Sequence, residues 1–252
     1  MDLGVAGRVY VITGGAGGLG RATAEVLVAE GARVLLSGRN SDTLATAVAG
    51  LGAESAAWLA ADNSDPQTPQ RLQQAAQQRW GRLDGLLISV GGPPAGPVTE
   101  KTDQEWSAAF ESVFIGAVRL AREFGAVLPV GGSITFVLSS SARTPLPNMA
   151  ISNGLRPGLA MVAKTLADEL GPAGIRVNGL LPGRIDTPRV AELDALSGDA
   201  DEARARHCAQ IPLGRYGEPA EFGSVAGFLM SPAASFLTGV MLPVDGGLLR
   251  SL

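Results

Sequence analysis

The sequence predicts an α/β fold in which a parallel sheet is covered by helices on both faces. Strand-like and helix-like segments alternate along all 252 residues, as expected of this class. The segment Gly85-Leu86-Leu87-Ile88 is a continuous apolar run, which is typical of a parallel strand buried on both faces. A short β-branched strand beginning at Val9 leads through a glycine-rich turn into a helix over Arg21 to Glu30, and this strand–turn–helix order begins many parallel sheets.

The rest of the chain supplies further elements of the same kind. Seven segments are expected to be strands: Arg8–Thr13, Arg33–Ser37, Ser55–Ala61, Gly85–Val90, Ser133–Ser139, Arg176–Leu181 and Val240–Val244. Asp103 begins a long segment whose apolar residues recur at helical spacing through Leu120. The stretch from Pro188 to Gln210 is the least regular, and it is either a mobile lid over a substrate or a surface excursion.

Composition excludes several classes of protein. With 46% hydrophobic and 17% charged residues, the chain can form one substantial core, and we expect residues 1–252 to be a single domain. The net charge of -4 provides no basic face for nucleic acid. No apolar run is long enough to span a bilayer and no signal peptide is visible. One cysteine, Cys208, indicates a reducing compartment, so we expect a cytoplasmic protein.

Metal chemistry is not expected. The single histidine, His207, lies in the polar stretch from Asp201 to Gln210, where a solvated helix face is the simplest interpretation. A metal site needs clustered ligands, and the sequence has none.

The glycine-rich turn is the strongest functional signal. Gly15, Gly17 and Gly20 fit G-x-G-x-x-G, whereas Thr13-Gly14, Gly18 and Gly20 fit T-G-x-x-x-G-x-G. Between a strand and a helix, either pattern places backbone N–H groups around an anion, usually a dinucleotide pyrophosphate. We therefore expect Gly14, Gly18, Leu19 and Gly20 to bind a dinucleotide; the alternative is a turn that binds no ligand.

The second glycine pattern resembles that of the short-chain dehydrogenases/reductases, and the similarity extends over nearly the whole chain. The other matching stretches are Leu83-Asp84-Gly85-Leu86-Leu87, Gly174-Ile175-Arg176-Val177-Asn178, Leu181-Pro182-Gly183-Arg184-Ile185-Asp186-Thr187 and Pro243-Val244-Asp245-Gly246-Gly247. The sequence is most similar to the β-ketoacyl carrier-protein reductase-like branch. The resemblance implies one Rossmann-type, doubly wound domain with a seven-stranded parallel sheet, a small-molecule substrate, and a homotetramer or homodimer.

Charge after the second strand favours NADP(H) over NAD(H). Gly38 stands where NAD-preferring relatives place an acid, and Arg39 follows it; a guanidinium suits the 2′-phosphate. Alternatively, Arg39 is simply exposed in a chain whose basic residues include only two lysines. The resemblance also implies cofactor contacts from a further set of residues: Asp62 at the adenine, Gly91 after the fourth strand, and Pro182, Gly183, Ile185 and Thr187 at the nicotinamide amide.

The family's catalytic pattern is broken in this chain. Relatives use a Tyr-x-x-x-Lys pair with an upstream serine; the tyrosine protonates the substrate oxygen, the lysine lowers its pKa, and the serine orients the carbonyl. These positions fall on Ser152, Arg156 and Ser139. The family's helical asparagine falls on Val113, and its Asn-Asn-Ala-Gly motif has become Ile88-Ser89-Val90-Gly91.

The substitutions change what the site can do. A serine hydroxyl is a far weaker acid than a phenol, and an arginine stays charged, so neither donates a proton readily. Of the two tyrosines, Tyr10 is expected in the core and Tyr216 at a packing position. Alternatively, Ser152 caps the following helix and Arg156 packs at the surface, with no catalytic role for either.

These observations favour an NADP(H)-dependent oxidoreductase acting on a carbonyl or alcohol, with Ser139, Ser152 and Arg156 as its altered catalytic residues. Hydride transfer would depend on positioning, Ser139 hydrogen bonding and Arg156 charge, with the proton coming from water or the substrate. The alternatives are a catalytically inactive dinucleotide-binding homologue (a sensor or partner subunit), a structural protein without cofactor, and another chemistry on the same fold.

Overall fold

The seven strands form one parallel sheet, as the sequence predicts. The computed structural model describes residues 2–196 and 198–251. The strand order is β3-β2-β1-β4-β5-β6-β7, and every neighbouring pair is parallel. The strands are β1 (Val9–Thr13), β2 (Arg33–Gly38), β3 (Ala56–Ala60), β4 (Gly85–Ile88), β5 (Ser133–Val137), β6 (Arg176–Pro182) and β7 (Met241–Val244).

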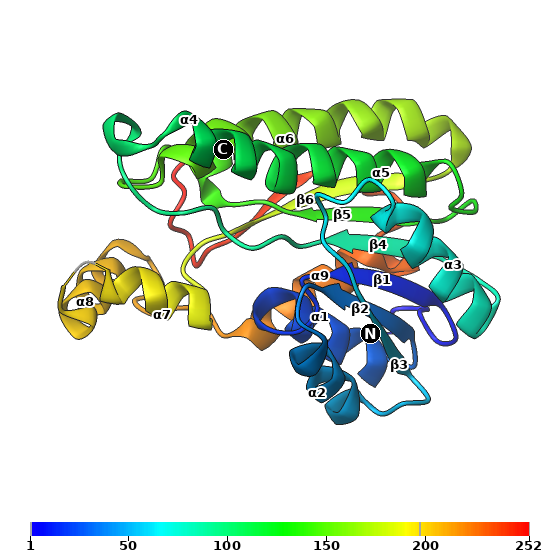
Figure 1. The fold of residues 1–252 in the computed structure, drawn as a ribbon. Helices are drawn as coiled ribbons and strands as arrows, with labels where there is room; N and C mark the ends of the chain where they lie inside the picture. Colours follow the sequence, from blue (N-terminus) through cyan, green and yellow to red (C-terminus); the bar gives the residue numbers. More distant parts are fainter. Residues whose placement is uncertain (1, 197, 252) are drawn as a thin grey trace.

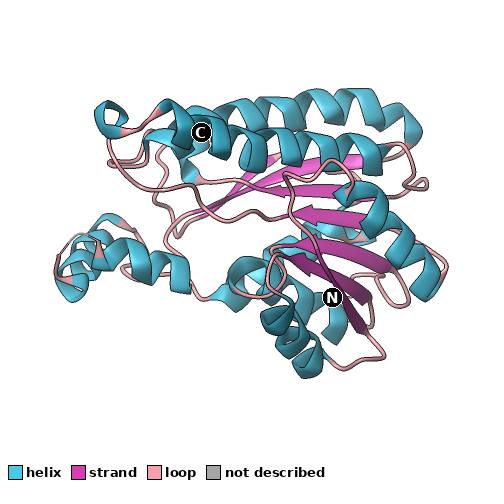
Figure 2. Ribbon diagram, viewed as in Figure 1, coloured by secondary structure: helices cyan, strands magenta, loops and turns pink. Residues whose placement is uncertain are grey.

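Helices cover both faces of this sheet (Figures 1 and 2). One core contains side chains from α3, α5 and α6, and the other contains side chains from α1, α2 and α9. The α-helices are α1 (Gly18–Ala29), α2 (Ser41–Leu51), α3 (Thr68–Trp80), α4 (Asp103–Ala109), α5 (Gly116–Gly125), α6 (Ala150–Leu170), α7 (Pro188–Ala195), α8 (Ala200–Gln210) and α9 (Pro219–Met230). Short 3-10 helices are η1 (Val98–Glu100), η3 (Ser140–Ala142), η4 (Gly171–Ala173) and η5 (Pro232–Ala234).

The order of the strands reverses between β1 and β4. The chain moves outward from β1 to β2 and β3, and then returns to place β4 on the other side of β1. At this topological switch point, a crevice opens beyond the carboxyl ends of the strands, where ligands of α/β proteins bind. The expected Rossmann-type fold is therefore confirmed, and it places the glycine-rich turn at this point.

Two segments differ from expectation. The helix from Asp103 to Gly125 is continuous but contains a π-helical stretch, η2 (Phe110–Ile115). A Cβ on Gly116 would clash with the carbonyl oxygen of Asn63, so the helix approaches the β3–α3 loop closely there. The stretch 188–210, expected to be the least regular, instead forms α7 and α8, which project beyond the carboxyl end of the sheet (Figure 1).

We predict that Phe222→Ala lowers the free energy of unfolding by about 3–5 kcal/mol. Phe222 on α9 is completely buried in the core beneath α1 and α2, so truncation leaves a cavity that the sheet cannot fill. Phe236→Ala is the matched control because Phe236 is fully exposed. Urea denaturation measures both variants, and equal losses would contradict the assignment of this core.

Candidate functional site

Close backbone packing shapes the glycine-rich turn. Gly14 has a φ of 61° and Gly18 a φ of 52°, a region that favours glycine. A Cβ on Gly20 would clash with the carbonyl oxygen of Gly14, and one on Gly14 would lie 2.5 Å from the carbonyl oxygen of Ser89. Helix α1 begins at Gly18, earlier than the expected Arg21, so its first backbone N–H groups come directly out of the turn.

The ends of other strands meet this turn. The Thr13 hydroxyl at the end of β1 donates to the Ser89 carbonyl at 3.0 Å and accepts from the Ser89 N–H at 2.9 Å. From the loop after β6, the Thr187 side chain lies within 4 Å of a Cβ built on Gly18. A Cβ built on Gly17 or Gly91 would have no neighbouring atom within 4 Å. The structure therefore brings Gly18 close to Thr187 and Gly14 close to Ser89, with open space beside Gly17 and Gly91.

The remaining candidate cofactor residues lie at the start of α1 and at the carboxyl end of β6. Leu19 is half-buried in the first turn of α1 and packs against the core beneath α2. After β6, Ile185 is buried and pairs with Gly217, and Pro182 ends the strand. A Cβ on Gly183 would lie 2.7 Å from Asp245 Cβ, so only glycine fits this tight approach.

Arg39 and Asp62 lie at the carboxyl ends of β2 and β3, and both are exposed. Asp62 accepts hydrogen bonds from the backbone N–H and hydroxyl of Ser64. These bonds lower the pKa of Asp62, and the nearby charge of Arg39 lowers it further. Within the described residues, no carboxylate pairs directly with Arg39, so its guanidinium is available to a ligand.

Three serines come together where β5 ends. Ser139 is the N-cap of η3, and its hydroxyl oxygen accepts from the Ser141 N–H at 3.1 Å. The Ser141 and Ser152 hydroxyl oxygens are 3.0 Å apart, and both side chains are buried. Ser152 is the third residue of α6 and does not cap it, because the N-cap is Met149. The structure therefore joins Ser139 and Ser152 through Ser141, a residue that the sequence analysis missed although it belongs to the run Ser139-Ser140-Ser141.

Arg156 lies one helical turn beyond Ser152 and is 4% exposed. The alternative, that Arg156 packs at the surface, is therefore wrong. Its Nη1 donates to the Val137 carbonyl at 3.0 Å, while its buried Nε has no partner. Burial lowers the pKa of Arg156 to about 10. Burying a guanidinium that has only one neutral hydrogen-bond partner costs free energy, because its charge loses hydration without gaining an opposite charge.

Comparison with known proteins identifies the family. The family described as Enoyl-(Acyl carrier protein) reductase matches residues 14–249. The chain belongs to the short-chain dehydrogenase/reductase family. It is therefore an oxidoreductase of the short-chain type, and the resemblance read from its motifs is confirmed.

Individual relatives agree over most of the chain. An uncharacterized oxidoreductase of Mycobacterium tuberculosis is 38% identical over 249 residues, covering 95% of this chain and 90% of that protein. The cis-4-hydroxycyclohexanecarboxylate dehydrogenase of Sinomonas cyclohexanicum is 33% identical over 245 residues, covering 95% and 96%. The crystal structure of L-sorbose reductase from Gluconobacter frateurii, complexed with NADPH and L-sorbose, has a TM-score of 0.92 at 31% identity and covers both chains completely.

The two tyrosines of this short-chain oxidoreductase are buried away from the three serines. Tyr10 lies on β1 in the core beneath α1, and burial raises its pKa to about 12. Tyr216 is also buried; its hydroxyl donates to Asp194 Oδ2 at 3.0 Å and lies 3.1 Å from His207 Nδ1. Neither hydroxyl is hydrogen-bonded to the three serines or to Arg156.

The Tyr216 contacts belong to a polar network that fastens α7 and α8 to the loop after β6. Arg184 of this loop donates to Asp194 Oδ1 of α7 at 3.0 Å and to His207 Nε2 of α8 at 2.8 Å. The Arg204 guanidinium lies 4.4 Å from the centre of the Tyr216 ring and forms an ion pair with Asp186. The expectation of a solvated His207 is therefore wrong: the imidazole is part of this network, which no local pattern in the sequence indicates.

Arg189 makes a second connection between α7 and the site. Its Nη2 donates to the Pro93 carbonyl at 2.8 Å, so α7 contacts the loop that follows β4. Its Nε is buried without a partner and lies about 3.0 Å from where a Cβ on Gly92 would be. No motif in the sequence singles out Arg189, although it stands two residues after Thr187.

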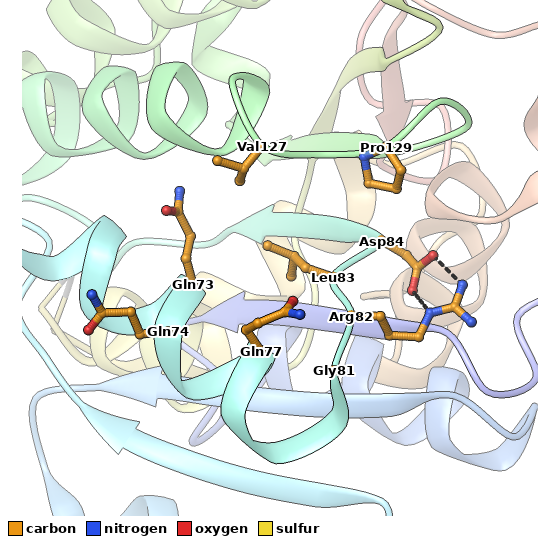
Figure 3. A pocket seen from close by; sticks show the side chains of 9 residues that line it. All are labelled: Gln73, Gln74, Gln77, Gly81, Arg82, Leu83, Asp84, Val127 and Pro129. Carbon is orange, nitrogen blue, oxygen red and sulfur yellow. Dashed lines mark hydrogen bonds and ion pairs between the residues drawn. The ribbon is translucent and has the colours of Figure 1, made fainter.

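Other features lie apart from this edge. A hollow of about 700 Å³ is lined by α3 and by residues before β4 and β5, including Gln73, Leu83 and Pro129 (Figure 3). It lies at the amino ends of these strands, opposite the serines.

Across residues 2–196 and 198–251, no three His, Cys, Asp or Glu side chains form a group that could hold a metal ion. None of the helices in the described ranges is long and apolar enough to cross a membrane.

We predict that stability falls in acid because of His207. Arg184 donates to Nε2, so the imidazole is neutral with its hydrogen on Nδ1, facing Tyr216. Burial, and then the charge of Arg184, lowers the pKa of His207 below its ordinary 6.5. The unfolded chain therefore takes up the proton first, and the stability that neutral His207 contributes is complete above pH about 6.5 and is lost as the pH falls below it.

Thermal unfolding between about pH 8 and pH 5 measures this effect, since these values bracket the ordinary imidazole pKa. His207→Gln should lessen the fall in the unfolding midpoint, and no second histidine can contribute in its place. A fall equally steep in wild type and variant would refute the role of His207.

Proposed function

We propose that the protein is an NADP(H)-dependent oxidoreductase acting on a carbonyl or alcohol, with an altered catalytic set of Ser139, Ser152 and Arg156. The observation that carries the proposal is that the open glycine-rich turn and the serine–arginine cluster share the carboxyl edge of one parallel sheet. Ligands of such sheets bind at this edge. The expectation of a cytoplasmic homotetramer or homodimer, and of a lid formed by residues 188–210, belongs to the same proposal.

The chain's residues fit a phosphorylated dinucleotide. Gly14, Gly18 and Gly20 permit a close approach to backbone N–H groups at the start of α1, which suits a pyrophosphate. Arg39 is exposed and has no carboxylate partner among the described residues, which suits a 2′-phosphate. NADPH in the similar L-sorbose reductase structure supports the same choice of cofactor.

When bound, the nicotinamide ring supplies or accepts a hydride. Ser139 accepts from the Ser141 N–H, which leaves its own hydroxyl hydrogen free to donate to a substrate oxygen. Arg156 adds a fixed positive charge that stabilises negative charge developing on that oxygen. Neither group gives up a proton, so the proton that completes the alcohol comes from water or from the substrate itself.

The relatives support a carbonyl or alcohol substrate. The similar structure contains L-sorbose, and the Sinomonas relative is named for a hydroxylated cyclohexanecarboxylate. The rival function, an inactive dinucleotide-binding homologue, is favoured by the absence of a tyrosine hydroxyl bonded to the described serine cluster. Both functions require the cofactor; only the first requires hydride transfer.

Arg39→Ala should weaken NADPH binding by about 10- to 100-fold, the value of charge-assisted hydrogen bonds to one phosphate. NADH binding should change little, because NADH lacks the 2′-phosphate. Arg33→Ala is the matched control: Arg33 is exposed on the same strand but at its opposite end. Calorimetric titration with both nucleotides measures this, and equal losses for NADPH and NADH would argue against the phosphate contact.

Purified protein with NADPH and a panel of ketones and β-ketoacyl thioesters should oxidise NADPH, measured by nicotinamide absorbance. The double variant Ser152→Tyr/Arg156→Lys provides the family's proton donor, and general acid catalysis of this kind accelerates a reaction by about 10²–10⁴-fold. Ser152→Phe/Arg156→Lys is the control, since it adds the ring without the hydroxyl. NADPH binding without turnover by wild type, together with turnover by the tyrosine variant, would favour the inactive homologue.

A further inference from the structure

Arg156 carries a buried charge that the described part of the chain does not balance. Its side chain is 4% exposed, yet its one hydrogen bond is to the neutral Val137 carbonyl. Within residues 2–196 and 198–251 no carboxylate forms an ion pair with it, and burial alone depresses its pKa. By contrast, the other buried arginine, Arg176, donates four hydrogen bonds to backbone carbonyls, and the buried Asp84 and Asp194 both have arginine partners. Buried charges in proteins are ordinarily paired, so an unpaired one indicates a missing partner.

The surroundings of Arg156 supply hydrogen-bond donors rather than acids. Ser152 lies one turn earlier on the same face of α6, and its hydroxyl meets that of Ser141. Ser139, which is half-buried just after β5, accepts from the Ser141 N–H and is thereby linked to this pair. The buried Nε of Arg156 still lacks an acceptor. Hydroxyl and guanidinium donors together with an unpaired charge are the composition of an anion site.

We propose that Arg156 and the serines form a carboxylate-binding site, so that the substrate is a carbonyl or alcohol that also bears a carboxylate. This inference rests on the proposed function, because it assigns a substrate class to the same site. The dinucleotide phosphates are expected at the glycine-rich turn and at Arg39, so they do not neutralise Arg156. The family's phenol, which could have become the negative partner, is replaced by Ser152, and an anion from the substrate takes over that role.

The oxidised state of the cofactor sharpens this argument. An oxidised nicotinamide ring is itself cationic, and a second positive charge close by in a low-dielectric site is unfavourable. A substrate carboxylate offsets this repulsion, whereas a neutral substrate leaves it unopposed. In the complex with NADP+, the charge on Arg156 therefore favours a hydroxy acid over its ester.

Binding can be tested without turnover. Benzoate and benzamide have nearly the same shape but differ in charge, and calorimetric titrations of each are made on the protein with and without NADP+. We expect benzoate to bind wild type about 10- to 100-fold more tightly than benzamide, and Arg156→Gln to remove this preference. Arg156→Lys should retain part of it. Arg79→Gln is the control for the change of net charge, because Arg79 lies on α3, far along the sheet from the serines.

Stability provides an independent measurement. In a buffer poor in anions, Arg156→Met should raise the midpoint of thermal unfolding, since it removes an unpaired buried charge and retains most of the packing. Benzoate should raise the midpoint of wild type but not that of Arg156→Met. If Arg156→Met instead has a lower midpoint than wild type in the anion-poor buffer, the charge is already balanced within the protein and the proposal is overturned.

The two proposals can fail separately. If benzamide binds as tightly as benzoate, or if Arg156→Gln keeps the preference, the carboxylate site is refuted even where NADPH binds and is oxidised. If neither NADPH nor NADH binds, the proposed function is refuted, whereas the benzoate preference of the free protein still tests the anion site. With an active enzyme, a panel of keto acids should be reduced at least about tenfold more efficiently than the corresponding methyl esters.

Discussion

The parallel direction of all seven strands is the constraint on which the site depends. It sends the chain out of β1, β4, β5 and β6 at the same edge, although these strands are separated by long stretches of sequence. The Thr13–Ser89 hydrogen bonds and the contact of Thr187 with Gly18 are direct consequences. Helices on both faces exclude water from the sheet, so a side chain buried at its edge, such as Arg156, lies in an environment of low dielectric where charge matters most.

The two parts of this edge, the glycine-rich turn and the end of β5, differ in how their charged and polar groups are exposed to solvent. At the glycine-rich turn, the chain presents backbone N–H groups and an exposed Arg39, which lose little solvation until a ligand arrives. At the end of β5, Arg156 is already desolvated, and the folded chain bears that cost. Replacing a buried charge by an apolar residue of similar size is often neutral or stabilising, so the charge of Arg156 is not needed for the fold alone. The glycine-rich turn and Arg39 are thus suited to binding phosphate groups, and Arg156 to stabilising negative charge that enters the site.

The sequence predicts the local part of this picture and misses the part that depends on tertiary contacts. Strands, helices and the turn at Gly14 and Gly20 follow from hydrophobic periodicity and from glycine geometry, both of which are properties of short segments. The positions of Ser139, Ser152 and Arg156 could be read from family spacing, but their environment could not. The burial of Arg156 and the bridging role of Ser141 arise only when β5 and α6 pack together. Likewise, His207 lies in a polar stretch that reads as a surface helix, and its partners Arg184 and Asp194 come from two other elements.

The network around Tyr216 holds its hydroxyl away from the serine cluster. Its hydroxyl donates to the carboxylate of Asp194, and burial together with this bond raises its pKa to about 12. Moving it to the serines would strip a partner from the buried Asp194 and break the link between α7, α8 and the loop after β6. The same loop contains Ile185 and Thr187, so the network positions one wall of the candidate cofactor site. Tyr216 thus holds this loop and the two helices together, and under the proposed function the proton for the substrate has another source.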